Sequence, residues 1–208
     1  MVNALHESIV ATERANLHNL PTDCPQRDER MFWLNDATVR FEELPFNFET
    51  GRLFPKIVHD IMDAQDEVGA IPCTVPFIYG TQPTDPVCSS FLIAVKQAYL
   101  HHGDTTLLRE AYPALCAWND RIYQMSNDGI VSNTLYGDWA SPEDCCMEIA
   151  PFSVVTPGAI LSTGYCYYNA RLLARFAEIL SLEQDAAAHR NRAEMIRMAM
   201  LQKWLQED

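Results

Sequence analysis

Length, composition and charge already exclude several classes of protein. The chain has 208 residues, 48% of them hydrophobic, and its 28 acidic and 15 basic residues give a formal net charge of −13 at pH 7. This hydrophobic content is typical of globular domains and too high for intrinsic disorder. No apolar run approaches the roughly 18 residues that a transmembrane helix needs. Because nucleic acids and anionic membranes attract clustered Lys and Arg, neither is expected as a partner.

The cysteines and the N-terminal residues indicate a reducing compartment. The seven cysteines are odd in number and irregularly spaced, and the neighbouring pair Cys145-Cys146 has poor geometry for a disulfide. The first ten residues lack the basic and apolar regions of a signal peptide. We therefore expect a cytoplasmic protein. The histidines form no HExxH motif, so we expect no zinc site and assign no metal or cofactor.

Helical periodicity dominates the chain. Apolar residues at helical spacing predict an amphipathic helix over residues 53–67. Its apolar face carries Phe54, Ile57, Val58, Ile61 and Met62. Further helices are expected over residues 2–18, 35–44, 91–102, 105–126, 157–181 and 183–206.

Local signals mark several helix boundaries. Gly103 is a natural residue just past a helix end, and Asp104 is a natural cap for the next helix. Pro113 is expected near the start of that helix or at a break in it. In the first helix, the spacing of Leu5 and Ile9 predicts one face, which Thr12 and Asn16 share.

Three long loops separate these helices. Residues 19–32, 68–86 and 127–156 carry most of the Pro, Gly, Asn and Asp, and loops of this length usually serve binding or catalysis. Short strands are expected around residues 70–72 and 130–132. The class is therefore all-α, and successive helix pairs favour stacked α-hairpins, arranged as a toroid or a solenoid.

The loop that follows the first helix has the richest chemistry. Within residues 22–36 lie four carboxylates, two arginines and two aromatic residues. Carboxylates this crowded should raise the pKa of at least one of them, and a raised carboxyl beside an aromatic wall suits a general acid. Arg27 could hold a carboxylate or a pair of sugar hydroxyls, and Trp33 offers an apolar face to a sugar ring. The alternative is a solvated, salt-bridged loop that caps the next helix.

A second loop segment leaves two interpretations open. Residues 136–139 place a tryptophan, Trp139, next to the acidic Asp138 in a segment too polar for a core. This segment could belong to a site or form a structural turn.

The sequence from Asp23 to Arg30, followed by Trp33 and Asp36-Ala37, resembles the signature of the bacterial α-L-rhamnosidases of glycoside hydrolase family 78. The resemblance covers most of the chain, from about residue 5 to 206. It continues through residues 69–72, 99–104, 112–113, 118, 137–139 and 163–177.

This resemblance implies an (α/α)6 barrel whose loops at one end bind a terminal α-L-rhamnose. It implies hydrolysis with inversion, in which one carboxylic acid protonates the glycosidic oxygen and a second carboxylate activates water. Glu29 takes the position of the general acid. The positions that line the sugar subsite are taken by Asp23, Arg27, Asp28, Trp33 and Asp36, and an aromatic wall by Trp139.

The chain departs from the family pattern in three ways, of which the first two are substitutions in the loops. Two glycines that normally flank the signature tryptophan are replaced by Phe32 and Asn35, which could change the shape of the loop. A Trp and an Asp that normally precede the fourth helix correspond to Cys88 and Ser90. This second change leaves the specificity for rhamnose open.

The family's general base is a Glu preceded by Trp in the C-terminal part of the barrel, and no Trp-Glu dipeptide occurs here. Within the chain, only Asp138, Glu143 and Asp144 are candidates for a base. Roughly seven helices cannot close a twelve-helix toroid, so an open apolar face is expected. We therefore expect residues 1–208 to form a single α-helical domain that is a fragment of a catalytic barrel and inactive alone. Its partners would be terminal α-L-rhamnosides or related glycans, and either the missing C-terminal half of the barrel or further copies of the chain that cover the open apolar face.

Two other functions are compatible with the sequence. A non-catalytic sugar-binding protein or degenerate half-barrel remnant could keep Asp23, Arg27 and Trp33 for recognition. A purely structural α-hairpin scaffold could pair through its open apolar face.

Overall fold

The chain is all-α, as the sequence predicts. The computed structural model describes residues 1–132, 134–138 and 155–205, and in these ranges eight helices and one two-stranded sheet occur. The helices are α1 (Val2–Asn16), α2 (Leu34–Arg40), α3 (Leu44–Asn47), α4 (Leu53–Ala64), α5 (Ser90–His102), α6 (Thr105–Gln124), α7 (Gly158–Ile179) and α8 (Glu183–Trp204). The sheet pairs β1 (Ser126–Asn127) with β2 (Ile130–Val131) in antiparallel register.

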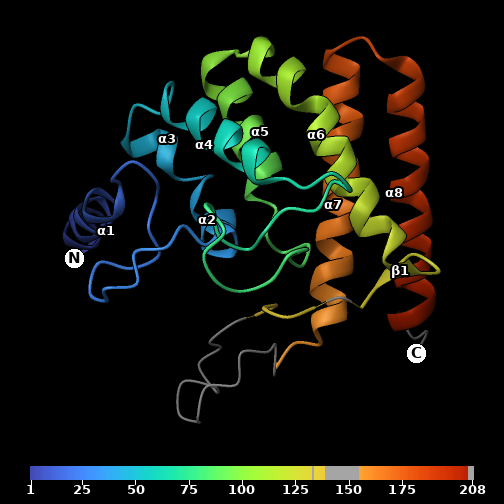
Figure 1. Cartoon of the computed structure of the whole chain (residues 1–208), viewed down its shortest axis with the longest axis horizontal. Helices are drawn as coiled ribbons and strands as arrows, with labels where there is room; N and C mark the ends of the chain where they lie inside the picture. Colours follow the sequence, from blue (N-terminus) through green and yellow to red (C-terminus); the bar gives the residue numbers. More distant parts are fainter. Residues whose placement is uncertain (133, 139–154, 206–208) are drawn as a thin grey trace.

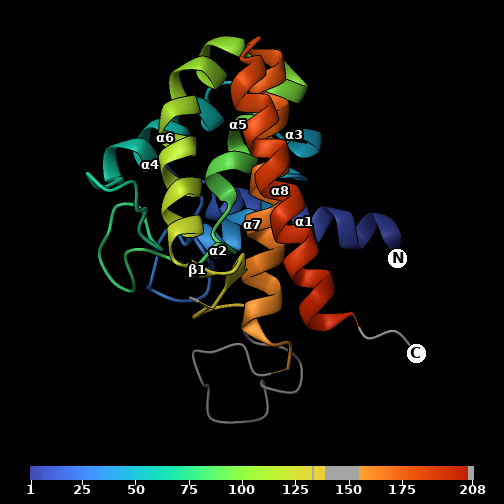
Figure 2. The same cartoon turned by 90° about the vertical axis from the view of Figure 1, so that its right-hand side faces the viewer.

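The helices pack as successive hairpins (Figures 1 and 2). Helices α7 and α8 run side by side along their lengths, α6 packs on α7, and α4 packs on α5. Helix α1 lies at the opposite end of the molecule from α8. The loop after α1, the loop after α4 and residues 134–138 after β2 lie at the same end, drawn at the bottom of Figure 1. Residues distant in the sequence are thereby brought together at this loop end.

Local sequence signals explain the best-defined boundaries. Gly103 ends α5 in the left-handed region at φ 66°, and the Asp104 side chain accepts a hydrogen bond from the Leu107 amide at 2.9 Å. Both boundaries were predicted from these residue types. Pro113 lies inside α6 rather than at its start or at a break, so the helix continues despite the missing amide donor.

Burial of one face stabilises α4. Phe54, Ile57, Val58 and Ile61 are completely buried, while Met62 is partly buried against the core. Each buried side chain of this size contributes about 1.5–3 kcal/mol relative to exposure. The predicted apolar face is confirmed. None of the helices in the described part of the chain is both long and apolar enough to cross a membrane.

Helix α1 is anchored by polar residues and not by its apolar ones. Leu5 and Ile9 are 63% and 42% exposed, whereas Glu13 and Asn16 are buried. The reason is a tertiary contact: Arg40 of α2 donates two hydrogen bonds to the Glu13 carboxylate, at 2.9 and 2.7 Å. The helical spacing predicts the helix but not which of its sides is covered.

Two of the long loops are joined by backbone hydrogen bonds. Trp33 and Thr74 form an isolated antiparallel bridge, where Leu34 N donates to Cys73 O at 2.9 Å and Val75 N donates to Phe32 O at 3.1 Å. The strand expected at residues 70–72 does not form, while the one expected near residue 130 corresponds to β2. This bridge brings the loop after α4 against the chemically rich loop after α1.

Candidate active site

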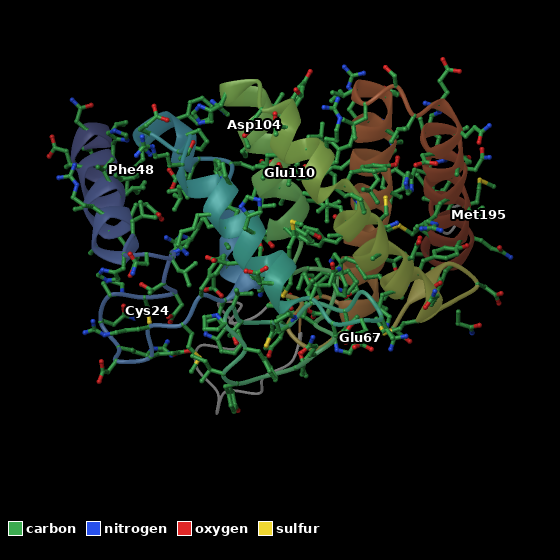
Figure 3. The ribbon with its side chains drawn as sticks, turned by 45° about the horizontal axis from the view of Figure 1, so that its top comes forward. Cys24, Phe48, Glu67, Asp104, Glu110 and Met195 are labelled. Atoms are coloured by element: carbon green, nitrogen blue, oxygen red, sulfur yellow. The ribbon has the colours of Figure 1, made fainter. Side chains whose placement is uncertain are left out.

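At the end of the molecule where the loops after α1 and α4 meet, these loops and residues 135–136 enclose a cavity of about 750 Å³. Its walls come from the loop after α1 with the start of α2, from residues 77–81, and from residues 135–136. The first wall is polar, with Asp23, Cys24, Arg27, Glu29, Trp33, Asn35 and Asp36. The other two walls are mostly apolar, with Phe77, Ile78, Tyr79, Gly80, Thr81, Leu135 and Tyr136. In Figure 3, Cys24 marks the loop after α1, at the opposite end of the molecule from Asp104.

Glu29 is held by two neighbours. The indole Nε1 of Trp33 donates to Glu29 Oε1 at 2.7 Å, and Arg27 Nη1 lies 3.6 Å from Glu29 Oε2. The Glu29 side chain is 27% exposed, so it is oriented by protein and still open to the cavity. A carboxyl in this arrangement can exchange a proton with a bound molecule.

Asp23 is fixed by the backbone and by its neighbour. Its Oδ1 accepts a hydrogen bond from the Met31 amide at 3.2 Å, and its own amide donates to Met31 O at 3.0 Å. The Cys24 thiol donates to Asp23 Oδ2 at 2.6 Å. Loss of hydration and this contact with Asp23 raise the pKa of the Cys24 thiol, so the protonated thiol is favoured.

One carboxyl of this crowded loop, Asp36, has a raised pKa, and burial is the main cause. Surrounding protein atoms reduce the hydration of this side chain in the first turn of α2, which raises its pKa. The charges of Asp23 and Glu29 act in the same direction, while the Asp36 amide and Arg40 oppose them. The sequence predicted this effect without identifying the residue.

Trp33 is the central aromatic side chain of the cavity. The ring of Tyr136 lies edge-on to it with centroids 5.7 Å apart, and that of Tyr79 lies edge-on at 6.5 Å. Edge-to-face pairs at these separations are favourable. Trp33 also forms the N-cap of α2, so the backbone and the side-chain contacts fix its position together.

Comparison with known proteins identifies the family. The model of the bacterial alpha-L-rhamnosidase 6 hairpin glycosidase domain matches residues 1–208. The chain belongs to this family. The resemblance seen in the sequence is thereby confirmed.

Several rhamnosidases are similar in sequence to this chain. An alpha-L-rhamnosidase of Streptomyces avermitilis is 30% identical over 213 residues, which cover the whole chain and 19% of that protein. One of Formosa agariphila is 29% identical over 192 residues, covering 90% of the chain and 20% of that protein. The chain thus spans about a fifth of the length of these curated relatives.

Solved structures agree with the helical hairpin architecture. An alpha-L-rhamnosidase from Dictyoglumus thermophilum superimposes with a TM-score of 0.92 at 32% identity, covering 99% of this chain and 23% of that one. The Streptomyces avermitilis alpha-L-rhamnosidase complexed with L-rhamnose gives a TM-score of 0.89 at 28% identity, covering 100% of this chain and 19% of that one. The predicted fold, an incomplete (α/α)6 toroid with long loops, is therefore confirmed.

In this rhamnosidase-family chain, five of the seven predicted site residues line the cavity: Asp23, Arg27, Glu29, Trp33 and Asp36. Asp28 does not line it. The Asp28 side chain is 96% exposed and accepts a hydrogen bond from Arg30 Nε at 3.0 Å. Trp139 lies outside the described residues.

Of the residues that depart from the family pattern, Asn35 lines the cavity, whereas Cys88 and Ser90 lie away from its surface. Cys88 and Ser90 are completely buried and are not among the lining residues. Thr84 Oγ1 donates to Cys88 Sγ at 3.0 Å. Burial and the charge of Asp85 raise the pKa of the Cys88 thiol well above its usual range. Of the three candidates for an internal base, Glu143 and Asp144 lie outside the described residues.

The third candidate, Asp138, accepts a hydrogen bond from the Thr156 amide at 2.8 Å and does not line the cavity.

The cavity residues from Phe77 to Thr81 were not predicted from the sequence. Phe77, Ile78 and Tyr79 are 49%, 67% and 68% exposed, although they are large and apolar. Three such residues in succession within a loop rich in proline were the available signal. Gly80 has φ +105°, and a Cβ there would lie 2.2 Å from Cys73 Sγ, so only glycine fits at this position.

In the described part of the chain, one cluster of side chains has potential metal-ligand atoms close enough together to hold an ion. Asp23, Cys24 and Glu29 each offer a ligand atom within 4.8 Å of the others. The Cys24 thiol already donates to Asp23, and a metal would need the thiolate instead. The hydrogen-bonded arrangement therefore suits an organic ligand better than a cation.

Proposed function

We propose that this chain carries the acid side of an α-L-rhamnosidase active site, with Glu29 as the general acid. The observation that carries the proposal is the setting of Glu29 between Trp33 and Arg27 in a cavity of about 750 Å³. The membership of the chain in the rhamnosidase family, and the similar Streptomyces avermitilis enzyme complexed with L-rhamnose, support α-L-rhamnosides as substrates.

The lining residues suit recognition of a sugar. The guanidinium of Arg27 can donate to ring hydroxyls, and the carboxylates of Asp23 and Asp36 can accept from them. The indole of Trp33 can pack against an apolar ring face while its Nε1 orients Glu29. We include Trp139 as an aromatic wall on the resemblance alone. Asp28 receives no support as a sugar contact, because its side chain points to Arg30 and is 96% exposed.

The proposed reaction is hydrolysis with inversion. Glu29 gives its proton to the glycosidic oxygen as the bond to the anomeric carbon breaks, and becomes a carboxylate. A second carboxylate removes a proton from water as that water attacks the opposite face of the sugar. The two carboxyls of inverting enzymes lie roughly 6.5–9.5 Å apart. We propose that the second one comes from the part of the barrel that follows residue 208 in the relatives, so the chain alone would not turn over substrate.

The test is the Glu29→Gln variant in the longest natural protein that contains these residues. With rhamnosides whose leaving groups are poor, the variant should lose at least about a hundredfold in kcat, the lower end of the range for general acid catalysis. Affinity for L-rhamnose, measured by calorimetry, should change little. The matched control is Glu67→Gln, an exposed glutamate that Figure 3 shows well away from Cys24, and it should keep full activity.

Two results would contradict the proposal. Full turnover by Glu29→Gln on these substrates would remove Glu29 from the role of acid. Binding of L-rhamnose without any hydrolysis by a natural protein that contains these residues together with the C-terminal part of the barrel would favour the non-catalytic sugar-binding alternative.

A further inference from the structure

A buried carboxylate joins two loops behind the cavity. Asp85 lies in the loop before α5 and is only 2% exposed. Its Oδ2 accepts hydrogen bonds from the amides of Leu135 at 3.0 Å and Tyr136 at 2.8 Å. Burial raises the pKa of Asp85, and the amides of Tyr136, Leu135 and Gly137 act against that rise. Hydrogen bonds to an ionised acceptor are stronger than neutral ones, so they fix the backbone of residues 135–136.

The residue held in this way reaches the aromatic centre of the site. Tyr136 is 9% exposed, and its ring packs edge-on to Trp33 with centroids 5.7 Å apart. A Cβ on Gly80 would lie 3.1 Å from the Tyr136 hydroxyl and 2.2 Å from Cys73 Sγ, so these groups meet beside Gly80. The Tyr136 ring is thus fixed from its backbone side and from its hydroxyl end.

The position of the Trp33 indole in turn fixes the Glu29 side chain, since Trp33 Nε1 donates to Glu29 Oε1 at 2.7 Å. We propose that Asp85 is a positioning residue, which sets the orientation of Glu29 through the contacts of Tyr136 with Trp33. As a statement about catalysis this rests on the proposed function. Asp85 does not line the cavity, so it would act only through this chain of contacts.

Loss of the Asp85 carboxylate would lower the rate by displacing the proposed general acid, Glu29. Without the Asp85 carboxylate, the amides of Leu135 and Tyr136 lose their buried acceptor, and residues 135–136 would shift to find another. The Tyr136 ring would then no longer hold the Trp33 indole in one orientation, and the hydrogen bond to Glu29 would lengthen or break. Small displacements of a catalytic group lower the rate strongly.

The test observes the Trp33 hydrogen bond directly and needs no turnover. The indole N–H resonance of Trp33 in the ¹⁵N-labelled chain is assigned by its absence in Trp33→Phe. The Glu29→Ala variant gives the chemical shift of this resonance when the carboxylate acceptor is absent. In Asp85→Ala we expect this resonance to move most of the way toward its Glu29→Ala position. In Asp85→Asn we expect it to stay near its wild-type position, because both amides use a single oxygen that asparagine keeps.

A matched control comes from Asp66, which lies in the same loop as Asp85, between α4 and α5. Its Oδ1 also accepts two backbone amides, from Val68 at 3.1 Å and Ala70 at 2.7 Å, but neither residue lines the cavity. Asp66→Ala should leave the Trp33 resonance unchanged. An equal displacement in Asp66→Ala and Asp85→Ala would overturn the proposal, because general loosening would then explain both.

An unchanged Trp33 resonance in a folded Asp85→Ala variant would also overturn it. If Asp85→Ala does not fold, Tyr136→Ala is the deciding variant: movement of the resonance supports the chain of contacts, and an unchanged resonance refutes it. In an active enzyme the expected signature of Asp85→Ala is a loss in kcat greater than any change in KM. Failure of Glu29→Gln to reduce hydrolysis would leave the spectroscopic result intact, so the two proposals fail separately.

Discussion

The indole Nε1 of Trp33 donates a hydrogen bond to Glu29 Oε1 at 2.7 Å. The same residue is the N-cap of α2 and forms a backbone bridge with Thr74. Glu29 itself lies in an irregular loop, so its side chain takes its orientation from a residue that the fold holds on several sides. The indole hydrogen bond is therefore the contact through which the scaffold would control the proposed acid.

Replacement of Trp33 by phenylalanine tests this contact. Trp33→Phe keeps an aromatic ring but removes the donor to Glu29. A hydrogen bond to a charged group contributes about 1.5–3 kcal/mol, which corresponds to roughly a 10- to 150-fold loss in kcat/KM for rhamnoside hydrolysis by the longest natural protein that contains these residues. Trp204→Phe at the end of α8 is the matched control and should keep wild-type kinetics, since Trp204 lies outside the cavity. Equal kinetics for Trp33→Phe and wild type would show that the indole donor is dispensable.

Gly80 is predicted to be intolerant of any side chain. Gly80→Ala places a Cβ within 2.2 Å of Cys73 Sγ at φ +105°, so the loop must move or strain. We expect the free energy of unfolding to fall by about 1–3 kcal/mol, the range for a residue held in a disfavoured backbone conformation.

The control for Gly80 is Gly164, inside helix α7, where a Cβ meets no atom within 4 Å. Gly164→Ala should raise the free energy of unfolding by roughly 0.5–1 kcal/mol, because alanine favours the helix. Urea denaturation of the two variants measures both effects. Similar stability changes in the two variants would contradict the close approach at Gly80.

The ion pair between Arg40 and Glu13 connects the first helix to the site. Arg40 binds Glu13 through two hydrogen bonds and also donates to Thr22 O at 2.8 Å, where the chemically rich loop begins. The two side chains are 17% and 9% exposed. Arg40→Met leaves Glu13 without its partner, and loss of one member of a buried pair costs about 3–5 kcal/mol.

A surface pair provides the comparison. Arg197 and Glu194 are 45% and 58% exposed, so Arg197→Met should change the free energy of unfolding by no more than about 1 kcal/mol. Chemical denaturation separates the two expectations. If Arg40→Met were no more destabilising than Arg197→Met, the pair with Glu13 would not be what anchors α1.

The sequence predicts those parts of the structure that depend on neighbours along the chain. The apolar face of α4 and the boundary at Gly103 follow from spacing and residue type within a few positions. The loop from Asp23 to Asp36 is recognisable for the same reason, since most of its chemistry lies in one continuous segment.

Long-range contacts account for what the sequence does not predict. Residues 77–79 enter the cavity because Trp33 pairs with Thr74, and no local pattern encodes that pairing. The exposure of Leu5 depends on the contact of Glu13 with Arg40. Whether a carboxylate of the signature faces the cavity, as Asp36 does, or solvent, as Asp28 does, is likewise set by the fold.

His189 should make the stability of the chain depend on pH. It is 8% exposed between α6 and α8, with its ring edge-on to Tyr112 and its Nε2 3.6 Å from Cys116 Sγ. Burial, followed by the charge of Arg192, lowers the pKa of His189, while Asp120 and Asp185 act in the opposite direction. The folded state therefore favours the neutral imidazole.

The sign of the effect follows from proton binding. Between the lowered pKa of the folded state and the ordinary value of about 6.5, the unfolded chain binds more protons at this histidine, so acidification favours unfolding. The contribution of His189 is fully present above about pH 6.5 and is lost as the pH falls toward its folded-state pKa. His189→Gln removes this proton uptake.

Denaturation curves at about pH 7.5 and about pH 5.5, on either side of the ordinary histidine value, provide the measurement. The loss of stability on acidification should be smaller in His189→Gln than in wild type. His18→Gln, which changes an exposed histidine, should lose as much stability as wild type. The variants keep all carboxyl groups of the wild type, so comparing them removes the carboxyl contribution to the change of stability with pH. The raised pKa values of Asp36 and Asp85 make that contribution opposite in sign to the one from His189. An identical loss in His189→Gln and wild type would mean that His189 titrates alike in the folded and unfolded chain.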